Sequence, residues 1–136
     1  GGGNTAYMLE LWKNCNLINI FKNAYEKGII LSGVSAGGVC WFDWILTDSL
    51  GSGYKPLKGI NLISGSCTPH SLEDNRMSQY QSEIKKNKLP PGVAIDDGVA
   101  VLFVNGVAKE VCSTRENCDA YFVDKNNKIS LKEYIK

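Results

Sequence analysis

The sequence lacks the patterns that mark membrane proteins and nucleic-acid-binding proteins. It has no run of 18 or more apolar residues, so it predicts no membrane-spanning helix. It also has no excess of charge of one sign, because 15 Lys and Arg oppose 14 Asp and Glu and leave a formal net charge of +1. Nucleic-acid binders usually carry a basic stripe, and membrane-surface segments carry a polybasic cluster. We therefore expect neither nucleic acid nor a membrane as a partner.

The cysteines lack the pairing that a metal site or a disulfide framework requires. There are five, an odd number, and no two form a C-x-x-C pair. Zinc sites use paired ligands at short spacing, and secreted disulfide frameworks use an even number of cysteines. We therefore expect free thiols in a reducing cytosol, and hence a cytoplasmic protein. The sequence shows no secretory signal and begins without Met, which we interpret as a trimmed product or a fragment.

The 136 residues, 43% of them hydrophobic, are enough for one packed core, and we predict a single domain over residues 1–136. Helices are expected at 5–14, at 17–27, from the glycine-rich segment at 33–38 through Trp44, and at 73–87. Strands are expected at 29–31, 61–63, 93–95, 100–104, 107–111, 121–124 and 128–131, with a hairpin turn at Asn105-Gly106.

This order of elements predicts an α/β fold: a doubly wound, mostly parallel sheet with helices on both faces and antiparallel hairpins at the C-terminus. A glycine loop that opens a helix normally follows a strand, but here nothing precedes Gly1-Gly2-Gly3. The sheet is therefore expected to lack N-terminal strands. Because an open sheet edge favours association, we expect a homodimer or a companion chain to cover it.

A candidate nucleophile lies in the segment Gly33-Val34-Ser35-Ala36-Gly37, which matches G-x-S-x-G between an expected strand and an expected helix. The motif places a serine hydroxyl on a tight turn above the sheet, and the flanking glycines avoid collisions with the neighbouring backbone. The alternative interpretation is a glycine-rich turn whose serine only caps the helix.

The candidate base is His70, the single histidine of the chain, which follows the strand expected at 61–63. Residues at the carboxyl ends of strands face the crevice in which open α/β sheets bind ligands. Asp48 lies between serine and histidine in the sequence and is the candidate third member of a Ser-Asp-His series. Asp43 is its alternative, although it falls inside the expected helix and could face solvent.

Two groups of backbone N–H donors could form an oxyanion hole, the site that stabilises the negatively charged intermediate. One donor is the N–H of Ala36, the residue after the candidate nucleophile. The other comes from Gly2 or Gly3, whose missing side chains let the backbone approach a substrate. Phosphate binding by this loop is a weaker interpretation, since no Walker sequence follows it.

The segments GGGNT at 1–5, GVSAGG at 33–38, LTDS at 46–49 and TPH at 68–70 resemble the peptidase E family of serine peptidases, which includes α-aspartyl dipeptidases and cyanophycinase. The resemblance implies a fold related to class I glutamine amidotransferases, of which this chain would hold the C-terminal two-thirds. It also implies hydrolysis of short peptides, dipeptides with N-terminal Asp among them, without a metal or cofactor. Carried over, Ser35 is the nucleophile, His70 the base and Asp48 the carboxylate.

Arg76 and Asn4 are the candidate substrate-binding residues. A guanidinium suits an acidic substrate side chain, and Arg76 follows His70 by six positions. Asp96-Asp97-Gly98, by contrast, is interpreted as a polar β-turn. Two alternatives remain open for the function: an esterase with the same triad, and a truncated, non-catalytic binding or scaffold domain.

Overall fold

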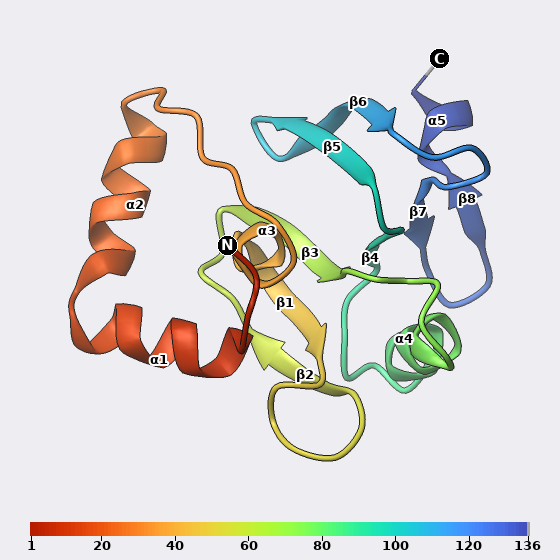
Figure 1. Cartoon of the computed structure of the whole chain (residues 1–136), viewed down its shortest axis with the longest axis horizontal. Coiled ribbons are helices and arrows are strands. Elements are labelled where there is room, and N and C mark those ends of the chain that lie inside the picture. The colour runs from red at the N-terminus through yellow and green to blue at the C-terminus, as the bar shows by residue number, and fades with distance from the viewer. Residues whose placement is uncertain (136) are drawn as a thin grey trace.

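The computed structural model of the chain describes residues 1–135 (Figure 1). The helices are α1 Thr5–Asn14, α2 Leu17–Glu26, α3 Ala36–Val39, α4 Arg76–Lys85 and α5 Leu131–Tyr134. The strands are β1 Phe42–Thr47, β2 Lys55–Lys58, β3 Ile63–Thr68, β4 Gly92–Ile95, β5 Val99–Val104, β6 Val107–Ser113, β7 Ala120–Val123 and β8 Lys128–Ser130. The predicted C-terminal hairpins are confirmed, including the turn at Asn105-Gly106 between β5 and β6.

A six-stranded mixed sheet in the order β2-β1-β3-β4-β7-β8 forms the centre of the α/β fold, and β5 and β6 form a separate hairpin. The pairs β1–β3 and β3–β4 are parallel. The pairs β1–β2, β4–β7 and β7–β8 are antiparallel. The prediction of a mostly parallel sheet is therefore wrong for the outer strands. The three parallel strands nevertheless place their carboxyl ends at one edge of the sheet.

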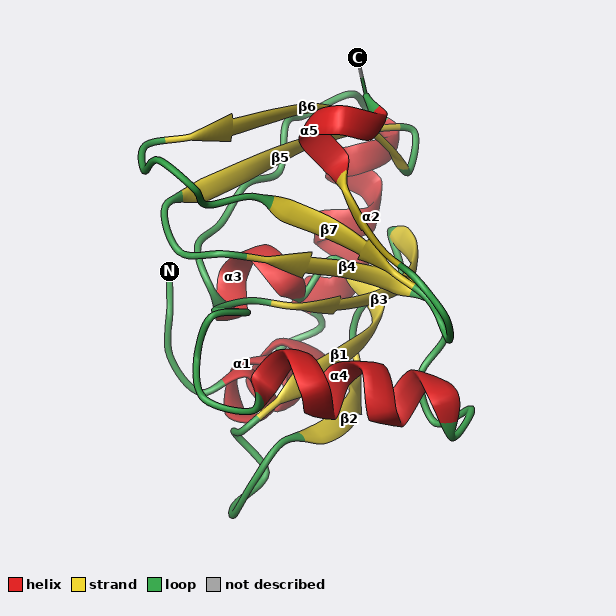
Figure 2. Ribbon diagram, turned by 90° about the vertical axis from the view of Figure 1, so that its right-hand side faces the viewer, coloured by secondary structure: helices red, strands yellow, loops and turns green. Residues whose placement is uncertain are grey.

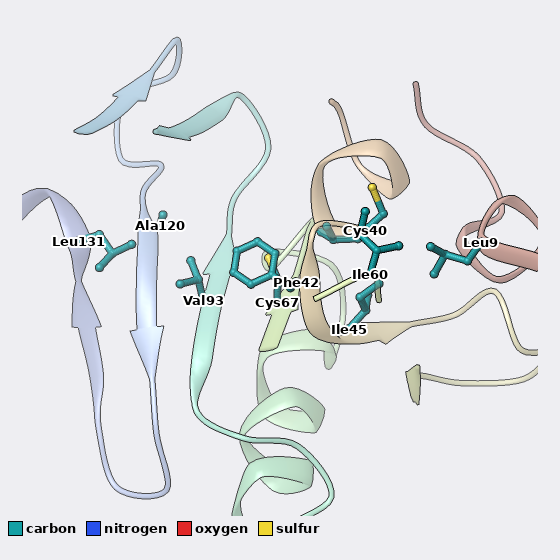
Figure 3. Close-up of a cluster of buried hydrophobic side chains, with 10 residues drawn as sticks. Leu9, Cys40, Phe42, Ile45, Ile60, Cys67, Val93, Ala120 and Leu131 are labelled. Carbon is teal, nitrogen blue, oxygen red and sulfur yellow. The ribbon is translucent and has the colours of Figure 1, made fainter. Parts of the chain in front are cut away.

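Both faces of the sheet are covered by other elements. Neighbouring residues of a strand point to opposite sides, so each strand contributes to two cores. Ile45 and Val93 belong to the core beneath α1, α3 and the β5–β6 hairpin (Figure 3). Leu46 and Ala94, the next residue in each case, belong to the core beneath α4. Helix α4 lies along the strands in Figure 2. Helices thus lie on both faces, as the sequence predicts.

The segment at 29–31 is not the buried strand that its apolar sequence predicts. It belongs to the irregular connection between α2 and α3 (Figure 1). Ile30 is 87% exposed. A strand forms only where another strand takes up its backbone hydrogen bonds, and no strand within residues 1–135 lies beside this segment.

The helix expected to reach Trp44 is also wrong. Helix α3 is a single turn that ends at Val39, and the chain then enters strand β1. The run from Phe42 to Thr47 contains aromatic and β-branched side chains, which pack better on a sheet than on a helix. Trp44 accordingly lies on β1, where Lys58 of the neighbouring strand stacks on its ring.

All five cysteines are free thiols, as predicted, and Cys40, Cys67 and Cys118 are buried. Burial raises the pKa of the Cys40 thiol to about 12 and raises that of Cys67 as well. Both therefore stay protonated at neutral pH and serve as small apolar core residues. Each helix among residues 1–135 is too short or too polar to cross a lipid bilayer.

Candidate active site

Ser35 occupies a strained turn immediately before α3. Its backbone has φ 53° and ψ −118°, a conformation that is unfavourable for a residue with a side chain. The flanking glycines are required by space: a Cβ on Gly33 would lie 1.9 Å from the carbonyl oxygen of Gly37, and one on Gly37 would lie 2.8 Å from that of Gly1. The turn that holds Ser35 therefore requires glycine at positions 33 and 37.

The N-terminal glycine loop lies against this turn (Figure 1). The N–H of Gly37 donates to the carbonyl oxygen of Gly1 at 3.1 Å. A Cβ on Gly2 would lie 3.6 Å from the Cβ of Ser35. Of the predicted oxyanion-hole residues, Gly2 and Ala36 thus lie next to Ser35, and Gly3 lines the same pocket as Ser35. Their role as donors stays a prediction.

Replacing Gly33 by Ala should destabilise the fold by about 3 kcal/mol, because the new methyl group would collide with backbone that cannot move away. Urea denaturation measures the effect. Gly106→Ala is the matched control: its Cβ meets open space, so it costs only the strain of φ +77°, about 1 kcal/mol. Equal losses in the two variants would contradict the packing described for the Ser35 turn.

His70 follows the carboxyl end of β3 and reaches the serine. Its Nε2 lies 2.9 Å from Oγ of Ser35, a hydrogen-bond distance across 35 residues of sequence. The imidazole is partly exposed, and the His70 backbone also has a positive φ, 51°. The structure therefore brings together the predicted nucleophile and the predicted base.

The carboxylate that contacts His70 is Asp97, which follows the carboxyl end of β4. Its Oδ1 lies 2.5 Å from Nδ1 of His70. An ionised carboxylate can only accept a hydrogen bond, so this contact favours the tautomer with its proton on Nδ1 and a lone pair on Nε2, facing Ser35. The three side chains form the chain order Ser35, His70, Asp97, which differs from the predicted Ser-Asp-His order.

The prediction of Asp48 as the residue that orients His70 is wrong in its geometry, and so is the alternative Asp43. Asp48 follows β1, and its exposed carboxylate pairs with Nη2 of Arg76 at 3.4 Å. Asp43 pairs with Lys58 at 3.2 Å on the neighbouring strand. Because β4 is the strand next to β3 on the side away from β1, the Nδ1 side of His70 meets the loop after β4 instead.

The sequence does not identify Asp97 as a site residue, because the segment Asp96-Asp97-Gly98 matches a β-turn pattern. Asp-Asp-Gly is typical of a β-turn, and this interpretation leaves the aspartates without a function. The position of Asp97 in the sequence could have identified it: Asp97 lies two residues after the end of β4, as His70 lies two residues after the end of β3. Since β3 and β4 are parallel neighbours, the residues that follow their carboxyl ends meet at one edge.

A pocket of about 180 Å³ opens beside the Ser35–His70 pair. Its charged side chains are those of Asp48, Glu73 and Arg76, and His70 also lines it. The Arg76 side chain is 2% exposed, and its Nη1 contacts Glu73 at 3.0 Å. The same nitrogen donates to the carbonyl oxygen of Pro69 at 3.1 Å. Arg76 thus lines the crevice, as predicted, but its guanidinium already forms ion pairs with Asp48 and Glu73.

Asn4 is used locally. Its Oδ1 accepts the N–H of Tyr7 at 2.8 Å and caps α1, and its Nδ2 donates to the Ser49 carbonyl oxygen at 3.3 Å. Its role in substrate binding stays a prediction. Residues 1–135 contain no group of three or more His, Cys, Asp or Glu side chains arranged to hold a metal ion.

Comparison with known proteins gives two matches. Residues 1–111 match the model of peptidase family S51. The chain is also 39% identical over 124 residues to a protein of Bacillus subtilis (strain 168) described as "Uncharacterized peptidase YgaJ". That alignment covers 90% of this chain and 54% of the relative, so the chain spans about half the length of the protein it matches.

Proposed function

This chain belongs to peptidase family S51, and we propose that it is a serine-type exopeptidase that hydrolyses short peptides through Ser35, His70 and Asp97. The observation that carries the proposal is the 2.9 Å contact between Ser35 Oγ and His70 Nε2, with Asp97 on the other ring nitrogen. A serine hydroxyl is a weak nucleophile unless an adjacent base accepts its proton, and this geometry supplies the base.

The reaction would proceed through an acyl-enzyme. Ser35 Oγ attacks the scissile carbonyl carbon while His70 Nε2 takes the hydroxyl proton. Backbone N–H groups of Ala36 and the Gly2–Gly3 loop stabilise the oxyanion. His70 then gives the proton to the leaving amine, and water, activated by the same imidazole, hydrolyses the ester bond to Ser35. Asp97 stabilises the imidazolium throughout.

The pocket supports a substrate that carries both signs of charge. An N-terminal aspartyl residue has an ammonium group and a side-chain carboxylate in close proximity. The ammonium group would bind the exposed carboxylates of Asp48 and Glu73. The substrate carboxylate would then replace one of them as the ion-pair partner of Arg76. We therefore propose dipeptides with N-terminal Asp as substrates. The five free thiols fit a reducing compartment, and we propose the cytoplasm as its location.

A panel of four compounds tests this function: Asp-Leu, Asn-Leu, N-acetyl-Asp-Leu and a neutral acyl ester. Hydrogen bonds to charged groups contribute about 1.5–3 kcal/mol, so kcat/KM for Asp-Leu should exceed that for Asn-Leu or N-acetyl-Asp-Leu by about tenfold to a hundredfold. Turnover of the ester with none of any peptide would favour the esterase alternative. Absence of Ser35-dependent turnover of all four would contradict the proposed function and favour a binding domain.

A further inference from the structure

A second aspartate beside the triad, Asp96, is buried without a cation. The residue is 3% exposed, and no Lys, Arg or His side chain in the described part of the chain forms an ion pair with it. Removing a carboxylate from water is costly unless its oxygens accept hydrogen bonds. Both oxygens do: Oδ1 accepts from the Ser71 hydroxyl, and Oδ2 accepts from the N–H of Asp119 at 2.9 Å.

These contacts join the two loops that carry the triad base and the triad carboxylate. Ser71 directly follows His70, and Asp96 directly precedes Asp97. The N–H of Ser71 donates to the carbonyl oxygen of Ile95 at 3.1 Å, next to the bond between the Ser71 hydroxyl and Asp96. Three hydrogen bonds thus connect the two loops: the two made by Ser71, and the bond between His70 and Asp97.

The loop after β4 is in turn fixed to β7. The N–H of Asp96 donates to the carbonyl oxygen of Asp119 at 3.0 Å, while the Asp119 N–H donates to the Asp96 carboxylate. The Asp119 carboxylate accepts from the Ser130 hydroxyl of β8. The position of Asp96 is therefore set by the sheet itself.

His70 needs such a constraint. Its backbone φ of 51° lies in the left-handed region, which a residue with a side chain leaves unless surrounding contacts hold it there. A small error in its position matters, because a displacement of about 1 Å between reacting groups can cost a hundredfold in rate.

We propose that Asp96 is a positioning residue of the active site: through the Ser71 hydroxyl it holds His70 in the conformation that places Nδ1 on Asp97 and Nε2 on Ser35. This inference rests on the proposed function for its kinetic consequence, but its structural content can be measured without turnover.

The variants Asp96→Ala and Ser71→Ala test the inference kinetically. An alanine removes both carboxylate oxygens, so the Ser71 hydroxyl and the Asp119 N–H both lose their acceptor at position 96. Each variant should lower kcat for Asp-Leu by about tenfold to a hundredfold while KM changes less than about twofold. Ser71→Thr retains the hydroxyl and should recover most of kcat.

Ser66→Ala is the matched control, because Ser66 is also a buried serine with hydrogen-bonded partners, Tyr80 and the Pro90 carbonyl. It should lose stability without losing kcat. The proposal is overturned if Asp96→Ala and Ser71→Ala lower kcat no more than Ser66→Ala does at an equal loss of unfolding free energy, or if Ser71→Thr is as slow as Ser71→Ala.

The imidazole can also be observed directly, since His70 is the only histidine of the chain and its ring NMR signals need no assignment. The wild type and Ser66→Ala should show one slowly exchanging Nδ1–H proton and a single tautomer by ¹⁵N shift. Asp96→Ala should lose that proton signal. A retained signal would overturn the inference even if the wild type hydrolysed nothing, a result that would contradict the proposed function alone.

Discussion

Replacing His70 by Ala should lower the turnover of Asp-Leu by about 10⁴- to 10⁶-fold while the chain stays folded. The reason is that Ser35 loses its only base, and no second histidine exists to take its place. Ser35→Ala should cause a loss of the same size. The double variant should be no slower than either single one, because the two residues act as a unit. The measurement is steady-state hydrolysis, with folding checked by circular dichroism.

Ser52→Ala is a suitable control, since Ser52 is exposed in the loop between β1 and β2, away from the residues that line the pocket. It should retain wild-type turnover. Near-normal activity in His70→Ala would show that the 2.9 Å contact with Ser35 has no catalytic role.

Replacing Asp97 by Asn should lower kcat by about 10⁴-fold, while Asp48→Asn should mainly raise KM. An asparagine can present its NH₂ group to Nδ1 of His70, which favours the tautomer with the proton on Nε2 and leaves Ser35 without an acceptor. Asp48 is on the substrate side of the pocket, paired with Arg76 and remote from the ring nitrogen. Steady-state kinetics on Asp-Leu separate the two effects.

The two aspartates thus give opposite signatures. A 10⁴-fold loss of kcat in Asp48→Asn, with Asp97→Asn nearly unaffected, would support the chain order Ser35, Asp48, His70 and contradict a catalytic role for the contact between His70 and Asp97.

The site residues that the sequence predicts correctly are those whose signal lies within a few neighbouring positions. The pattern around Ser35 identifies a tight turn because side chains at Gly33 and Gly37 would collide with the backbone nearby. In the structure both positions are indeed too close to backbone atoms for a Cβ. His70 was identifiable because it follows an apolar strand and has no rival in the chain. Asp97 depends instead on which strands are neighbours, and it contacts a residue 27 positions away. The β-turn pattern at Asp96-Asp97-Gly98 does not indicate which strand lies beside β4.

The fold shows the same division between local and distant causes. The helices α1, α2 and α4 were predicted from their spacing of apolar residues and from end signals such as Asn4 and Gly28. The strand expected at 29–31 fails because its stability depends on a partner strand that residues 1–135 do not place beside it. Strand β1 has a local cause instead, since the aromatic and β-branched side chains of residues 42–47 favour a strand over the expected helix.

Covalent labelling with an alkyl fluorophosphonate tests the activation of Ser35 most directly, because the reagent needs an activated hydroxyl and no substrate specificity. After digestion, mass spectrometry should find one adduct, on the peptide that contains Ser35. His70→Ala should react at least about a hundredfold more slowly. No adduct on Ser35 in the wild type, or an adduct formed equally fast without His70, would contradict the account of this site.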